Sequence, residues 1–220
     1  MRNFLTGLLL VCAWTFASST WEYGVGSGNF VLFVPSTPDA RMIVALHGSG
    51  ERGKLSIENW QKEAEVEQYY VLAPNSDDPS GWGGSDIARV MSLVQQFKQK
   101  LGIKKTLLNG ASAGGHFALF LGITYPEYFD GVATFMGLVL TSIGEHIQYQ
   151  TDPKKKIQIL LIHGMKDDKI PIQNGRMNYY FLEAKGYPVT YWEEPNMTHE
   201  FYKKDTAKIL NWFEKLPRIK

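Results

Sequence analysis

The stretch KKTLLNGASAGGHFALFLG, Lys104 to Gly122, decides the fold class of this 220-residue chain. Its first part is a short apolar run typical of a buried strand, and its last part has the composition of a buried helix. Between them, Gly110, Ser112 and Gly114 stand in the G-x-S-x-G spacing. In that motif a serine sits on a strained turn from strand to helix, where the crowded backbone tolerates only small neighbours. The stretch therefore predicts a nucleophilic serine, Ser112, at the end of a strand in a helix-covered sheet.

The rest of the chain repeats this alternation of strand and helix. Apolar runs predict strands at residues 30–34, 42–46, 69–73, 106–108, 132–135, 157–162 and 189–192. Helical periodicity lies between them, at residues 57–68, 87–101, 113–125, 173–185 and 205–216. Strands followed repeatedly by helices predict an α/β fold: a mostly parallel, twisted sheet with helices on both faces.

Composition limits the classes of function. With 44% hydrophobic residues and a net charge of +1, the chain has enough apolar content for one domain and no field that would gather nucleic acid. We therefore expect no nucleic-acid partner, and no feature favours one oligomeric state. The five histidines are scattered and form no H-E-x-x-H motif, so the sequence predicts no metal and no other cofactor.

The first 19 residues resemble a secretory leader. A basic Arg2 precedes an uncharged apolar run of about a dozen residues and then the small residues SST, which is typical of a cleaved signal peptide. The alternative is an uncleaved buried helix. The run is shorter than the roughly 20 residues that a membrane-spanning helix needs. We therefore expect residues 1–19 to be a signal peptide, residues 20–220 to be the mature domain, and the protein to be secreted or periplasmic without stable membrane insertion. Cleavage would also remove Cys12, the single cysteine.

The segment IVALHGSGERGKLS, residues 43–56, fits two motifs. From Gly48 it reads G-x-x-x-x-G-K, as in a phosphate-binding P-loop, but Leu55 stands where that motif needs Ser or Thr to hold Mg²⁺. From His47 it reads H-G-x-G, a loop that supplies a backbone donor to an esterase oxyanion hole. We favour the second interpretation. Glu51 and Arg52 are then either braces of this loop or plain surface charges.

A serine nucleophile needs a base and an acid, and in this fold both follow it in the chain. Of the downstream histidines, His116 lies within the predicted helix and His163 ends a strand, where a structural role is more common. His199 lies in a loop between the last strand and the last helix, at the sheet edge where such sites assemble. We therefore predict His199 as the base. Asp167 and Asp168 both follow a strand, and their spacing does not choose between them as the carboxylate that orients the imidazole.

The motifs LHGSGERG, GASAGGHFAL, IHGMKDDKIP and THEF together resemble the α/β-hydrolase superfamily. Within it, the chain is similar to small serine esterases of the phospholipase/carboxylesterase, dienelactone-hydrolase and feruloyl-esterase type, and to related predicted secreted peptidases. The resemblance implies a single-domain α/β-hydrolase that cleaves carboxylic esters through an acyl-enzyme. The family pattern H-G-x-x-D-x-x-V-P favours Asp167 over Asp168. It also implies that the backbone N–H groups of Ser49 and Ala113 hold the oxyanion.

The substrate is expected to be a small-molecule or polysaccharide-linked ester. The interval from Gly137 to Ile157 is too short for a large cap domain, so we expect an open cleft. Trp82, in the Gly-rich loop NSDDPSGWGGSD, either stacks on the substrate or packs on the protein's own surface. Two alternatives to an esterase stay open at this point. One is a serine peptidase of the same fold, and the other is a non-catalytic secreted carbohydrate-binding protein.

Overall fold

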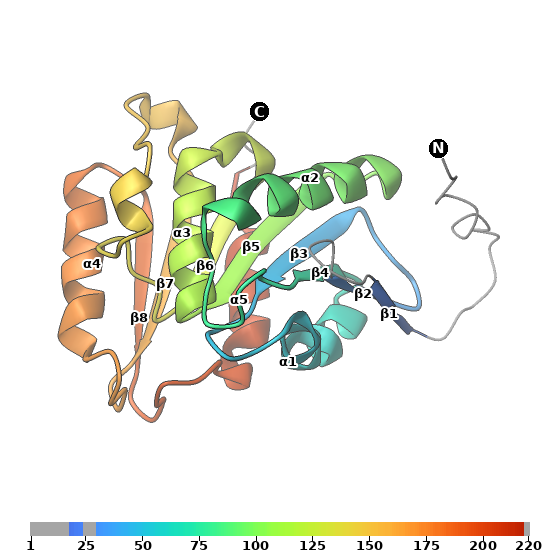
Figure 1. Ribbon diagram of the computed structural model, residues 1–220, viewed down its shortest axis with the longest axis horizontal. Coiled ribbons are helices and arrows are strands. Elements are labelled where there is room, and N and C mark those ends of the chain that lie inside the picture. The colour runs from blue at the N-terminus through green and yellow to red at the C-terminus, as the bar shows by residue number, and fades with distance from the viewer. Residues whose placement is uncertain (1–17, 24–29, 218–220) are drawn as a thin grey trace.

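The computed structural model describes residues 18–23 and 30–217. They form one eight-stranded sheet with helices on both sides (Figure 1). The strands are β1 Ser19–Tyr23, β2 Phe30–Val34, β3 Arg41–Leu46, β4 Tyr70–Pro74, β5 Lys105–Ala111, β6 Gly131–Phe135, β7 Ile159–Gly164 and β8 Val189–Glu194. The α-helices are α1 Gly53–Val66, α2 Gly84–Lys100, α3 Ala113–Thr124, α4 Ile172–Ala184 and α5 Thr206–Glu214. Four short 3₁₀ turns are η1 Pro126–Tyr128, η2 Gly144–His146, η3 Pro153–Lys155 and η4 Lys203–Asp205.

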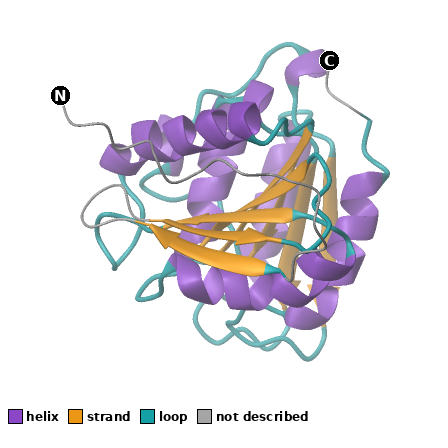
Figure 2. Ribbon diagram, turned by 90° about the vertical axis from the view of Figure 1, so that its right-hand side faces the viewer, coloured by secondary structure: helices purple, strands orange, loops and turns teal. Residues whose placement is uncertain are grey.

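The sheet has the order β1-β2-β4-β3-β5-β6-β7-β8. The strands from β4 to β8 run parallel, whereas β1 and β2 pair antiparallel at one edge. Figure 2 shows the sheet twisted between its two helical layers. This arrangement confirms the predicted mostly parallel α/β fold, and parallel strands bring the loops that follow them to one edge.

Two apolar clusters hold the layers together. One packs α2, α3 and α4 on one face of the sheet, and the other packs α1 and α5 on the opposite face. The central strand β3 serves both, because successive side chains of a strand point to opposite faces. Met42 and Val44 belong to the first cluster, and Ile43 and Ala45 to the second. All four are buried, which explains why this strand appeared in the sequence as an unbroken apolar run.

The predicted elements are all present, but several boundaries differ. Helix α1 begins at Gly53, four residues before the predicted start at Ile57. A β-carbon on Gly53 would lie 2.3 Å from the carbonyl oxygen of Ala73, and the Gly53 N–H donates to the Asn75 side chain at 2.7 Å. A close contact with β4 thus sets the start of this helix. Strand β5 runs to Ala111 because β6 continues to pair with it there.

The first strand of the sheet was not predicted. β1 begins at Ser19, the last residue of the predicted signal peptide, and pairs with β2. Residues 1–17, which hold nearly all of that predicted leader, lie outside the described residues. Within residues 18–23 and 30–217, no helix combines the length and apolar composition needed to cross a membrane. Between β6 and β7 the chain forms only the short turns η2 and η3, so no large cap is inserted there among the residues that the structure describes.

Candidate active site

Ser112 occupies the sharp turn between β5 and α3. Its backbone angles, φ 52° and ψ −119°, are unusual for a residue other than glycine, as expected for a strained nucleophile turn. A β-carbon on Gly110 would lie 2.2 Å from the Gly114 carbonyl oxygen, and one on Gly114 would lie 2.3 Å from that of Leu46. The two glycines of the G-x-S-x-G motif therefore let helix α3 approach β5 and the end of β3. The Ser112 N–H donates to the Phe135 carbonyl at 2.9 Å, which ties the turn to β6.

Three side chains that are distant in the sequence meet at this turn. The His199 Nε2 lies 3.0 Å from the Ser112 Oγ. The His199 Nδ1 lies 2.9 Å from Asp167 Oδ2 and 3.0 Å from Oδ1. A carboxylate accepts the Nδ1 proton, which leaves the Nε2 lone pair free to accept the serine hydroxyl proton. This geometry suits a serine that is deprotonated as it attacks.

Asp167 is buried and held by the backbone of its own loop. Its Oδ1 accepts the N–H groups of Lys169 at 2.9 Å and Ile170 at 2.8 Å. Burial by itself raises the pKa of the Asp167 carboxyl, but the backbone donors and His199 outweigh it and hold the pKa below its usual value. The carboxyl is therefore ionised at neutral pH. Asp168, the residue that spacing left as an alternative, is exposed.

The other downstream histidines have different surroundings. His163 is buried, and its Nε2–H donates to the Ile170 carbonyl at 2.8 Å, so it braces the loop that carries Asp167. This confirms the structural role expected for His163. His116 accepts the Leu138 N–H at Nδ1, at 2.9 Å. Burial, and secondarily the nearby His199, lowers the pKa of His116 to about 4, so this ring is neutral beside the site.

The two predicted oxyanion donors lie on segments that pack closely together. Ser49 is in the loop after β3, and Ala113 is the first residue of α3. A β-carbon on Gly114 would lie 2.5 Å from the His47 carbonyl oxygen, so the loop and the helix start are in contact. In the described part of the chain, neither N–H donates to a protein acceptor. Both donors thus have the free N–H groups that an oxyanion hole requires.

Residues 47–51, which we call the oxyanion loop, are braced by the side chains around them. Glu51 Oε2 accepts the Gly48 N–H at 2.8 Å, and Arg52 donates to the Ser76 carbonyl at 3.3 Å. Of the two roles left open for Glu51 and Arg52, the structure therefore shows the bracing one. The ring of His47, to which the sequence analysis gave no role beyond opening the H-G-x-G motif, also bonds within this loop. Its position directly before Gly48 was the available signal.

Trp82 packs on the protein itself. Its indole is half-buried, stacks on Phe117 of α3 with ring centres 5.1 Å apart, and donates Nε1–H to the His47 carbonyl at 2.9 Å. Contact between Trp82 and a substrate stays a prediction.

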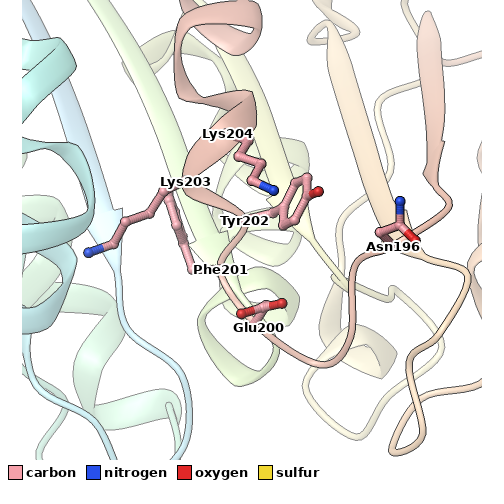
Figure 3. A pocket seen from close by; sticks show the side chains of 6 residues that line it. All are labelled: Asn196, Glu200, Phe201, Tyr202, Lys203 and Lys204. Carbon is pink, nitrogen blue, oxygen red and sulfur yellow. The ribbon is translucent and has the colours of Figure 1, made fainter.

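The segment between β8 and η4, which also carries His199, lines an open pocket of about 410 Å³ (Figure 3). Its walls combine two aromatic side chains, two lysines, one carboxylate and one amide. The lining residues are Asn196, Glu200, Phe201, Tyr202, Lys203 and Lys204. The sequence analysis did not identify this pocket. Among the described residues, no group of three or more His, Cys, Asp or Glu side chains is arranged to hold a metal ion.

Several known proteins are similar to this chain in sequence or in fold. Residues 85–216 match the model of the phospholipase/carboxylesterase family. Acyl-protein thioesterase 1 of Gibberella zeae is 20% identical over 215 residues, which cover 81% of this chain and 92% of that protein. The crystal structure of esterase PE8 is similar with a TM-score of 0.68 at 19% identity, covering 84% of this chain and 95% of the other. A truncated carbohydrate esterase from gut microbiota is similar with a TM-score of 0.73 at 16% identity, covering 92% and 98%.

Proposed function

Because the chain belongs to the phospholipase/carboxylesterase family and is a serine hydrolase, we propose that it cleaves carboxylic esters with Ser112 as nucleophile, His199 as base and Asp167 as the residue that orients His199. The observation that carries this proposal is the continuous contact from the Ser112 Oγ to the His199 Nε2 at 3.0 Å and from Nδ1 to the Asp167 carboxylate at 2.9 Å.

The reaction proceeds in two halves. His199 takes the Ser112 proton as Oγ attacks the ester carbonyl, and the backbone N–H groups of Ser49 and Ala113 hold the oxyanion of the tetrahedral intermediate. His199 then protonates the leaving alcohol, and an acyl-enzyme remains on Ser112. Water, deprotonated by the same imidazole, releases the acid. Each oxyanion donor contributes about 3 kcal/mol to the stability of the transition state.

The substrate is proposed to be a small or polysaccharide-linked ester. The described chain has no large cap inserted between β6 and β7, which favours a substrate whose remaining part extends into solvent. The pocket in the segment that carries His199 offers the Tyr202 ring and the Lys204 ammonium group to such an extension (Figure 3). Similarity in fold to a carbohydrate esterase supports the same choice, and the thioesterase relative adds thioesters as a second bond type to test.

Export through residues 1–19 is proposed on the leader pattern of the sequence. The test is N-terminal sequencing of protein recovered from the medium or periplasm of its host. A mature chain that starts near residue 20 supports export, and protein found only in the cytoplasm with Met1 or Arg2 at its terminus contradicts it.

The catalytic proposal is tested with Ser112→Ala and a panel of acetyl, butyryl, feruloyl and thioester substrates, beside peptide anilides. The variant should lose nearly all turnover and all labelling by a fluorophosphonate probe while keeping its melting temperature. Ser92→Ala, at an exposed serine of α2, is the matched control and should retain both. Turnover retained by Ser112→Ala refutes the assignment. Faster cleavage of anilides than of esters would instead favour the peptidase alternative.

A further inference from the structure

Trp82 joins the two segments that carry the proposed oxyanion donors. Its Nε1–H donates to the His47 carbonyl at 2.9 Å, in the oxyanion loop. Its ring stacks on Phe117 with an interplanar angle of 13°, and Phe117 is a fully buried residue of α3. Ser49 belongs to that loop and Ala113 begins that helix, so one side chain links the two donors.

The hydrogen bond from Trp82 fixes the first peptide group of the loop at one end. The other end of the same group, the Gly48 N–H, donates to Glu51 Oε2 at 2.8 Å. Because a peptide group is planar and rigid, partners on its C=O and on its N–H together hold its plane. Without the indole donor, only Glu51 would hold this peptide from outside the backbone.

The next peptide group carries the proposed donor of Ser49. Its carbonyl, on Gly48, lies 2.8 Å from the His47 Nδ1 and accepts the Glu51 N–H at 3.2 Å. In a trans peptide the C=O and N–H point in opposite directions. Holding the Gly48 carbonyl on the protein side therefore turns the Ser49 N–H to the opposite side, and the bonds to the carbonyl also polarise that N–H.

The ring of His47 is held in one tautomer, and Trp82 lies against it. The Ser76 N–H donates to the His47 Nε2 at 3.0 Å, so Nε2 carries no proton and Nδ1 donates to the Gly48 carbonyl. Burial lowers the pKa of His47, which keeps the ring neutral. The Trp82 and His47 rings are 4.8 Å apart. The indole thus supports both successive peptide groups of the loop, one by a hydrogen bond and the other through this ring.

We propose that Trp82 is a positioning residue of the oxyanion hole, which fixes the direction of the Ser49 N–H relative to the Ala113 N–H on α3. This inference rests on the proposed function, and it differs from a substrate-contacting role in its kinetic signature. A misdirected oxyanion donor weakens binding of the transition state alone, so it lowers kcat for every acyl group with little change in KM. Loss of a stacking contact raises KM for aromatic substrates.

The test uses two replacements of Trp82. Trp82→Phe keeps a ring on Phe117 and removes the N–H donor. Replacement by 3-benzothienylalanine preserves the indole shape with sulfur in place of the N–H, which protects against a folding defect. Both should lower kcat about 10- to 100-fold on acetyl and feruloyl esters alike, with KM within about twofold. Affinity for a boronic acid inhibitor, whose adduct on Ser112 mimics the tetrahedral intermediate, should fall by the same factor. Trp212→Phe, at a half-buried tryptophan of α5, is the control and should change none of these values.

The outcomes separate the inference from the proposed function. An unchanged kcat in the benzothienyl variant overturns the positioning role, and so does a rise in KM confined to feruloyl esters. A kcat loss of the same size in Trp212→Phe would overturn it too, because the effect would then be a general response to a lost tryptophan. Turnover in Ser112→Ala removes the proposed function itself, whatever the Trp82 variants do.

Discussion

Replacing Asp167 by asparagine should disable the site by forcing the wrong tautomer on His199. The Asp167 Oδ1 accepts two backbone N–H groups, from Lys169 and Ile170. In Asp167→Asn the amide oxygen must stay at those donors, because an NH₂ group there would face two N–H groups. The amide nitrogen then faces the His199 Nδ1, which can only accept. The imidazole proton moves to Nε2, and Nε2 can no longer take the proton of Ser112.

The expected loss in kcat is roughly 10⁴-fold, the size of effect produced by a wrong tautomer in a serine triad. This corresponds to a rise of about 5.5 kcal/mol in the activation barrier. KM should change little, because the carboxylate faces the imidazole and not the substrate. Steady-state kinetics on an acetyl ester measures both values. Asp168→Asn is a closely matched control, since it makes the same chemical change at the next residue, which is exposed.

Two results would contradict this reasoning. One is Asp167→Asn with more than about a tenth of the wild-type kcat, which would mean that His199 keeps its productive tautomer without the carboxylate. The other is an equal loss of kcat in Asp168→Asn, which would mean that the loss in Asp167→Asn is not specific to the carboxylate proposed to orient His199. A thermal melt of each variant establishes that a low kcat is not due to unfolding.

Two further substitutions test packing and charge around the same turn. Because a β-carbon on Gly114 would lie 2.3 Å from the Leu46 carbonyl oxygen, Gly114→Ala should lower the free energy of unfolding by about 1–3 kcal/mol and remove most turnover. Gly84→Ala, with no atom within 4 Å, should leave both unchanged in denaturation and ester assays. The pKa of His116 is lowered from 6.5 to about 4, so below pH 6.5 the unfolded chain binds a proton that the folded chain does not. The free energy of unfolding should therefore fall between pH 6.5 and pH 4, on the order of 3 kcal/mol. This fall should shrink in His116→Gln but not in His146→Gln, an exposed control, and equal pH slopes in the two variants would contradict it.

The sequence by itself was enough to predict the fold class and most of the helices and strands. A strand that is buried on both faces is an unbroken apolar run in the sequence. A helix that is buried on one face has apolar residues spaced about one helical turn apart, because only the buried positions need to be apolar. The G-x-S-x-G turn was recognisable from its spacing, because a crowded turn from strand to helix tolerates only glycine at the positions of Gly110 and Gly114. Fixed chain order placed the base and the acid downstream of Ser112, loop position then favoured His199, and the family pattern favoured Asp167 over Asp168.

Other features depended on contacts between segments that are far apart in the chain. β1 was not predicted because an edge strand is specified by its partner, here β2, as much as by its own residues. Helix α1 begins early because Gly53 lies against β4, a contact that local periodicity does not encode. The sequence did not determine the direction of the Trp82 side chain either, because its partners His47 and Phe117 are far from it in the chain.

The site illustrates most clearly the difference between what the sequence determines and what the tertiary structure determines. Sequence identified the types of residue that its chemistry needs and the loops that carry them. Only the tertiary structure brought the His199 imidazole to the Ser112 Oγ and to Asp167, turned Asp168 to solvent, and tied Trp82 to the loop after β3 and to α3. Local sequence determines backbone preference and burial. The direction of a side chain and its hydrogen-bond partner are decided by packing against distant residues, which exist as neighbours only once the sheet has formed.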